Sequence, residues 1–178
     1  LYQELGLRGE VNFPAFEQAL KGFSRYASGQ DRLLVLIDYT KPSTEKRFYI
    51  LDLLQKKLLL STYVAHGRGS GDNYAVAFSN RPGSYQSSLG FFRTGDTYMG
   101  KNGYSLFLDG LEKGINDKAR ERAIVVHGAN YADPAVLKGQ QRLGRSLGCP
   151  ALPPDISKQV IDTIKGGVLL YIYGLNKA

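Results

Sequence analysis

Residues 33–64 read LLVLIDYTKPSTEKRFYILDLLQKKLLLSTYV, and this stretch does most to indicate the fold class. It contains three apolar runs, residues 33–39, 47–53 and 57–64, with β-branched and aromatic residues among them. Runs of this length and composition are typical of β-strands. The second and third runs are separated only by Leu54-Gln55-Lys56, which is short enough for a hairpin loop. The stretch therefore predicts three strands that follow one another closely.

The flanking sequence predicts one helix before these strands and more strands after them. Pro14 opens residues 13–26, and Phe16, Leu20 and Phe23 recur there at helical spacing, so we expect a helix that packs on the domain. Residues 66–105 are rich in Gly, Ser, Asn and Tyr and predict loops and short strands. We also expect strands at 104–108, 123–126 and 168–173, short helices before residue 122 (capped by Asn116 or Asp117) and after Asp133-Pro134, and a helix over 154–165.

This succession of strands with few helices argues for a β-rich, mainly antiparallel α+β fold rather than a βαβ fold. A chain of 178 residues is compatible with a single domain, residues 1–178, and is long enough to bury a core without disulfides. We place the packing helix at about 13–27 and the core of the domain at about 32–174, bounds that rest on the strand and helix signals.

Composition narrows the class of partner. The net charge is +7, but the basic residues are dispersed, so we expect a solvated surface with weak attraction to an anionic polymer and no nucleic-acid partner. No stretch approaches the ~18 continuous apolar residues of a membrane span. Residues 1–10 lack the apolar block of a signal peptide, and the chain starts at Leu1 rather than Met. We therefore expect that a preceding segment has been removed.

The strongest functional signal is the single cysteine, Cys149, which lies between Gly148 and Pro150. A lone cysteine in a domain of this size is more often a small buried apolar residue than a nucleophile. The Gly-Cys-Pro turn and His127, 22 residues upstream at the end of an apolar run, favour a thiol nucleophile and its base. Such a turn also directs the N–H groups of Gly148 and Cys149 toward one point, as an oxyanion hole requires.

Other polar residues near this motif have more than one interpretation. Ser146 is either a polarising group or a turn residue that caps its own backbone. Arg145 is suited to hold a substrate carboxylate, with a plain surface arginine as the alternative. His66 with Asp72 lacks the spacing of a metal motif, so we expect no metal and interpret His66 as a substrate-loop or structural histidine.

These residues together resemble a known family. His127-Gly128, a gap of 18 residues, and then Ser146-x-Gly148-Cys149 is similar to the signature of the murein L,D-transpeptidase catalytic domain family, a YkuD-like group. Leu147 stands where the common signature has a second His, and Ala151 where it has Asn. The stretch 87–92, SSLGFF, resembles the Thr-Pro-x-Gly-x-Phe of the wider family. The resemblance covers roughly residues 45–174.

The resemblance implies a β-sandwich-like core and an exported, cell-envelope location. It also implies transfer of peptidoglycan stem peptides through a cysteine thioester, without a cofactor, and acylation by carbapenem-type β-lactams. His127 takes the role of the general base. The residues that we assign to catalysis are Cys149, His127, Gly148 and Ser146, and those that we assign to substrate binding are Arg145, His66, Ser88 and Gly90.

Two other functions stay open at this point. An L,D-carboxypeptidase or cysteine peptidase on the same polymer uses the same thiol chemistry and differs only in the acceptor, which the sequence does not reveal. A non-catalytic wall-binding module with the same fold is the second alternative, and Leu147 and Ala151 are the residues that favour it.

Overall fold

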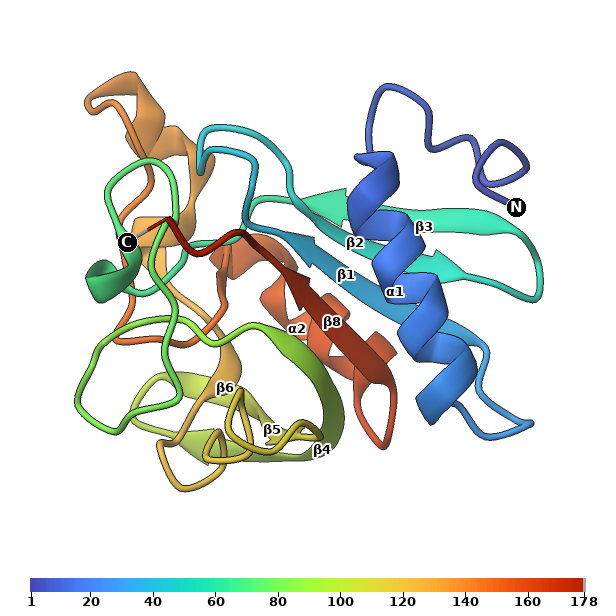
Figure 1. Ribbon diagram of the computed structural model, residues 1–178. Helices are drawn as coiled ribbons and strands as arrows, with labels where there is room; N and C mark the ends of the chain where they lie inside the picture. Colours follow the sequence, from blue (N-terminus) through green and yellow to red (C-terminus); the bar gives the residue numbers. More distant parts are fainter. Residues whose placement is uncertain (178) are drawn as a thin grey trace.

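The computed structural model describes residues 1–177. It contains an eight-stranded sheet and two α-helices, one on each side of the strands β1 and β8 (Figure 1). The helices and strands are α1 (Phe13–Tyr26), β1 (Leu33–Asp38), β2 (Phe48–Asp52), β3 (Lys57–Thr62), β4 (Gly90–Gly100), β5 (Gly103–Gly110), β6 (Val125–Gly128), β7 (Ala151–Leu152), α2 (Pro154–Ile164) and β8 (Leu169–Tyr173). Short 3-10 helices are η1 (Arg68–Ser70), η2 (Asn130–Ala132) and η3 (Pro134–Lys138).

The strand order in the sheet is β3-β2-β1-β8-β4-β5-β6-β7. All neighbouring strands are antiparallel except the pairs β1–β8 and β6–β7, which are parallel. The long strand β4 curves strongly and carries an irregularity between Thr94 and Thr97 (Figure 1). Extra residues in one strand bend and twist it, so the half of the sheet that contains β5 and β6 turns out of the plane of β1 and β8. This bend gives the sheet its sandwich-like shape and confirms the β-rich α+β class.

Two apolar clusters fill the two sides of the sheet. One lies between α1 and the face that carries Leu34, Leu36 and Leu169. The other joins α2 to the opposite face, with Val35 and Leu170 among its members. Neighbouring residues along β1 and β8 alternate between the two clusters, as the period of a strand requires. Both faces of β1 and β2 are therefore buried, which explains why their runs are mostly apolar, whereas β3 at the edge of the sheet is largely exposed or half-buried.

The strands and helices follow the sequence patterns closely, with three differences. The short strand β7 is not among the expected strands. Residues 90–100 form one long strand, β4, although their three glycines predict loops and short strands. The expected helix before residue 122 is wrong, because residues 112–123 form turns. Asn116 is buried there and does not cap a helix: its Oδ1 accepts the Glu112 N–H (2.9 Å) and its Nδ2 donates to the Leu89 and Phe91 carbonyls (both 2.9 Å).

Candidate active site

Residues 146–150 form a tight turn that leads into β7. The Ser146 hydroxyl donates to the Cys149 carbonyl at 2.6 Å and accepts the Gly148 N–H at 3.1 Å. Ser146 is therefore a turn residue that caps its own backbone, and the Gly148 N–H is already bonded. The Cys149 N–H forms no hydrogen bond with the residues the structure describes. Of the two N–H groups expected to form an oxyanion hole, only that of Cys149 is left to bind an oxyanion.

Gly148 has a backbone conformation that favours glycine, with φ at +127°. A Cβ placed on it would lie 3.0 Å from the Ile124 side chain and 3.1 Å from the Gln86 carbonyl oxygen. A side chain at this position would therefore be strained by the positive φ and crowded by its neighbours, which explains the Gly before the cysteine.

The Cys149 thiol is 9% exposed and faces the backbone just before β6. Its Sγ donates to the Ala123 carbonyl and accepts the Val125 N–H, both at 3.4 Å. Ala123 has a positive φ of 56°, a conformation that is uncommon for alanine. Burial raises the pKa of the thiol, while the Val125 N–H, Arg122 and Lys101 oppose that shift. The thiol is thus protonated at neutral pH and needs a base to react.

His127 lies in β6, the strand that pairs with β7 directly after the cysteine turn. Its register partner is Ala151, and its N–H donates to the Pro150 carbonyl at 3.4 Å. The structure therefore brings His127 and the cysteine turn into adjacent strands. His127 comes two residues after Val125, so the two side chains share one face of β6. No hydrogen bond joins the His127 imidazole to Cys149 within residues 1–177.

The imidazole of His127 is 3% exposed and is oriented by the main chain. Its Nδ1 lies 2.9 Å from the Gly128 carbonyl oxygen, so Nδ1 carries the proton and donates it. Nε2 is then the unprotonated nitrogen. Burial lowers the pKa of His127, and the bond to Gly128 opposes this shift. A neutral imidazole with a free Nε2 is the form that a general base needs.

Arg122 is a residue of this site that the sequence analysis missed. It lies in the turn before β6, and its guanidinium donates to Ser79, Ser84, Gln86 and Ser88. Its sequence context, Arg-Glu-Arg, is that of an ordinary charged surface turn. Only the fold shows that the segment 79–88 returns to this arginine.

Arg145 directly precedes Ser146 and contacts the glycine-rich segment 67–71. Its Nη1 donates to the Gly71 carbonyl and to Asp72 Oδ1, both at 3.2 Å. Asp72 is 85% exposed, so this ion pair is weak and easily exchanged for another carboxylate. The assignment of Arg145 to a substrate carboxylate stays a prediction.

The assignment of His66 to substrate binding needs correction. His66 is 1% exposed, its Nδ1 accepts from Arg47 Nη2 at 2.9 Å, and its Nε2 donates to the Gly71 carbonyl at 3.2 Å. Both ring nitrogens are therefore occupied. Arg47 is also buried and donates to the Val64 carbonyl, and it stacks on Tyr39 at 4.8 Å. His66 belongs to this structural network, which is the second of its two expected roles.

Ser88 and Gly90 are buried, and neither lines the three hollows described below. The Ser88 hydroxyl donates to the Ser79 carbonyl and accepts from Arg122, both at 2.7 Å. Gly90 begins β4 with φ at +98°, and a Cβ there would meet the Glu112 carboxylate at 2.2 Å. Their assignment to substrate binding is replaced by a structural role, in which they place the segment 79–90 beside the cysteine turn.

Two hollows are lined by residues that neighbour Cys149 or His127 in sequence, although neither residue itself lines them. One, of about 310 Å³, is lined by Pro82, Gly83, Tyr85, Arg122 and Leu147, and its wall residue Leu147 is 53% exposed. The other, of about 370 Å³, contains Gly128, the residue that orients His127, and is further lined by Lys101, Asn102, Tyr104, Ala129, Asn130, Pro154 and Ser157. Leu147 therefore contributes an apolar wall to the hollow that Arg122 also lines.

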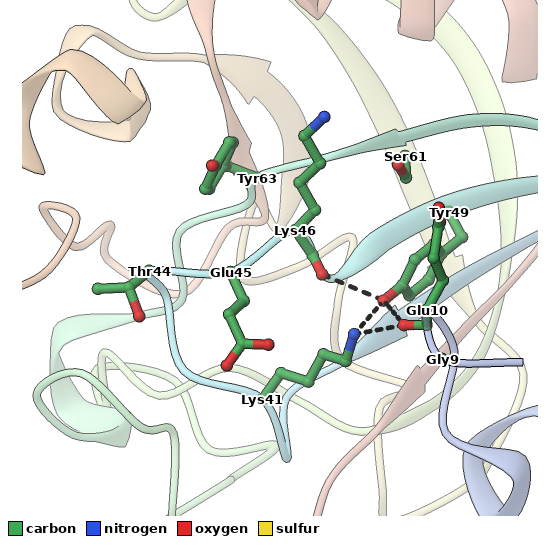
Figure 2. A pocket seen from close by; sticks show the side chains of 9 residues that line it. All are labelled: Gly9, Glu10, Lys41, Thr44, Glu45, Lys46, Tyr49, Ser61 and Tyr63. Carbon is green, nitrogen blue, oxygen red and sulfur yellow. Dashed lines mark hydrogen bonds between the residues drawn. The ribbon is translucent and has the colours of Figure 1, made fainter.

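A third hollow of about 370 Å³ lies apart from these residues, between the N-terminal segment and strands β2 and β3 (Figure 2). Its base is the Tyr49 hydroxyl, which accepts from Lys41 Nζ at 2.8 Å and lies 2.7 Å from the Glu10 carbonyl. Figure 2 shows the Lys46 ammonium pointing away from Lys41. None of the sequence-predicted site residues lines this hollow.

The segment 1–177 holds no group of three or more His, Cys, Asp and Glu side chains arranged to bind a metal ion. Neither of its α-helices combines the length and the apolar character that a membrane crossing requires.

Known proteins resemble this chain in sequence pattern and in fold. A sequence profile of the L,D-transpeptidase catalytic domain matches residues 7–173, and no curated protein matches the chain. The solved structure of the helical cell shape determining protein Pgp2 from Campylobacter jejuni is similar at a TM-score of 0.52 and 15% identity, over 83% of this chain and 50% of that chain. An L,D-transpeptidase from Mycobacterium smegmatis has a TM-score of 0.48 and 13% identity, over 80% of this chain and 59% of that chain.

The L,D-transpeptidase LdtMt1 in complex with imipenem has a TM-score of 0.47 and 14% identity, over 80% of this chain and 59% of that chain. The present chain thus spans between 50% and 59% of the length of these three proteins. At such identities the structural likeness concerns the fold.

Proposed function

Because the chain belongs to the L,D-transpeptidase catalytic domain family, we propose that it transfers acyl groups between peptidoglycan stem peptides, with Cys149 as nucleophile and His127 as base. The observation that carries this proposal is the pairing of β6 with β7. It sets a neutral imidazole with a free Nε2 beside the turn that holds the only thiol of the chain.

The proposed reaction has two steps. His127 Nε2 takes the thiol proton, and the thiolate of Cys149 attacks the carbonyl between the L-centre of a diamino acid and the terminal D-residue of a tetrapeptide stem. The C–N bond breaks, the D-residue leaves as an amine that receives the proton from His127, and a thioester remains. The side-chain amine of a second stem then attacks the thioester and restores the thiol. The free Cys149 N–H supports the proposal as an oxyanion donor.

The family acts on the cell wall, so we further propose an exported, envelope-associated location and peptidoglycan as the partner. A carbapenem is the matching inhibitor because its strained β-lactam carbonyl is attacked by the same thiolate. Ring opening loses no atom, so the adduct carries the full mass of the drug.

Intact-protein mass spectrometry with imipenem tests the proposal. We expect one adduct on the wild type, none on Cys149→Ala, and much slower formation on His127→Gln. His66→Asn is the matched control, because it replaces the other histidine of the chain and keeps the β6–β7 site; it should be acylated like the wild type. Absence of an adduct on the wild type, or an equal adduct on Cys149→Ala, contradicts the assignment of the nucleophile.

The products of a stem-peptide incubation decide between the transferase and the hydrolase of the same chemistry. Cross-linked dimers indicate transfer to an amine, and trimmed tripeptide stems indicate transfer to water. A wall-binding module without catalysis is expected to give neither product.

A further inference from the structure

The Arg122 guanidinium is fully engaged with one segment of chain. Its Nη1 donates to the Ser79 carbonyl (2.9 Å) and the Ser88 hydroxyl (2.7 Å). Its Nη2 donates to the Ser84 hydroxyl (3.1 Å) and the Gln86 carbonyl (2.8 Å). The four Nη hydrogens of an arginine are thereby used, and the planar group is fixed in place. All four acceptors lie within residues 79–88.

This fixed guanidinium also contacts the cysteine turn. A Cβ on Gly148 would lie 3.5 Å from Arg122 Nη2 and 3.1 Å from the Gln86 carbonyl that Nη2 binds. The four acceptors are neutral, and no ion pair found among residues 1–177 includes Arg122. Its positive charge is therefore not compensated by a carboxylate, although the side chain is partly buried.

The ionised form of the Cys149 thiol is the partner that we infer for the Arg122 charge. Arg122 and Lys101 both favour the thiolate, and Arg122 does so more strongly. Tyr39 and Tyr131 also lie near, but burial raises the pKa of each phenol to about 12, so both are neutral. With a neutral His127 on β6, the charged groups among residues 1–177 that influence the thiolate are the two cations.

We propose that Arg122 is a positioning residue of this site, which holds the segment 79–88 against the cysteine turn and places a fixed positive charge beside the Cys149 thiolate. This inference rests on the proposed function for its biological meaning. It predicts more than a structural role, because the charge itself, and not only the hydrogen bonds, stabilises the reactive form of the thiol.

The experiment is a titration of the thiol by NMR. Because the chain has one cysteine, labelling with [3-13C]cysteine gives a single resonance that reports the thiol pKa directly, without alkylation of a buried group. We expect Arg122→Gln to raise the thiol pKa by about one unit, as removal of a nearby opposite charge does. Arg122→Lys should restore most of the wild-type value, although it loses the planar set of hydrogen bonds.

Two control variants separate charge from packing. Arg120→Gln removes a cation two residues away that is exposed and pairs with Asp109 at 2.6 Å, so it should leave the thiol pKa unchanged. Ser88→Ala removes one acceptor of Arg122 and keeps its charge, so it should shift the pKa far less than Arg122→Gln.

Equal thiol pKa values in the wild type and Arg122→Gln, or equal shifts in Arg122→Gln and Arg122→Lys, would overturn the inference. The result is separable from the proposed function, because the titration needs no substrate. If imipenem acylates the wild type and the thiol pKa does not respond to Arg122→Gln, this inference fails alone. If imipenem never reacts and the pKa does respond, the proposed function fails alone.

Discussion

The burial of His66 predicts that the folded protein loses stability in acid. Its Nδ1 accepts a hydrogen bond from Arg47 Nη2, so protonation of that nitrogen would both break the bond and place two cations 2.9 Å apart. The pKa of His66 is lowered to about 3, mainly by burial and secondly by the positive charge of Arg47. The unfolded chain has a histidine pKa of about 6.5.

This difference translates into a loss of stability at low pH. Between the two pKa values the unfolded state binds a proton that the folded state does not, so the free energy of unfolding falls as pH falls. The stabilisation is fully present above about pH 6.5 and is lost progressively as the pH approaches 3. The loss reaches about 3 kcal/mol at about pH 4.5 and about 5 kcal/mol below pH 3. Domains of this kind have total stabilities of roughly 5–15 kcal/mol.

Urea unfolding followed by circular dichroism, at about pH 7 and about pH 4.5, measures this effect in the wild type and in His66→Asn. The Asn Oδ1 keeps an acceptor for Arg47 and does not titrate, so the acid-dependent loss should be smaller in the variant by about 3 kcal/mol. His127→Asn is the matched control, because it keeps His66 and should retain most of the loss. Parallel pH dependence of the wild type and His66→Asn would refute the argument.

Two glycine substitutions test the close contacts of the turn and of α1. Gly148→Ala should destabilise the protein by about 2 kcal/mol, since φ is +127° there, and should abolish acylation of Cys149 by imipenem; a stable variant that reacts at the wild-type rate contradicts this. Gly22→Ala in α1 should lower the thermal unfolding temperature despite a gain of about 1 kcal/mol in helix propensity, because its Cβ would lie 1.7 Å from the Phe91 ring. Overpacking of this kind costs roughly 1–3 kcal/mol. The exposed neighbour Lys21→Ala is the control, and an unfolding temperature of Gly22→Ala at or above that of the wild type would show that Phe91 moves freely.

The sequence predicted those parts of the fold whose signals are local. The bounds of α1 follow from Pro14 and the spacing of its apolar residues, and β1, β2 and β3 from their apolar runs. β4 was not predicted as one strand, because Gly90, Gly95 and Gly100 interrupt its pattern while the pairing with β5 and β8 holds it extended. Tertiary pairing of this kind leaves no local signal.

The candidate site shows the same division. Cys149 and His127 could be proposed from the sequence because the Gly-Cys-Pro turn and the strand before the histidine are visible there, and their catalytic roles stay a prediction. The assignments of His66 and Ser88 to substrate binding failed because of burial. Both side chains are polar and suited to bind a substrate, but the fold encloses them. Arg122 could not be found, since its partners lie 34 to 43 residues away along the chain.

The position of β8 in the sheet constrains how the molecule folds. It is the last strand along the sequence, yet in the strand order it lies between the groups β3-β2-β1 and β4-β5-β6-β7 and pairs with both. The segment after β3 adds a second link, because Ala65 pairs with Ala151 of β7. The pairing of β8 with β1 joins Leu34 to Leu169, so a long loop must close before either group is held in place. Contacts of this range make folding slow and cooperative. We therefore expect the two groups of strands, and with them the Cys149–His127 arrangement, to form in the same cooperative transition as the docking of β8.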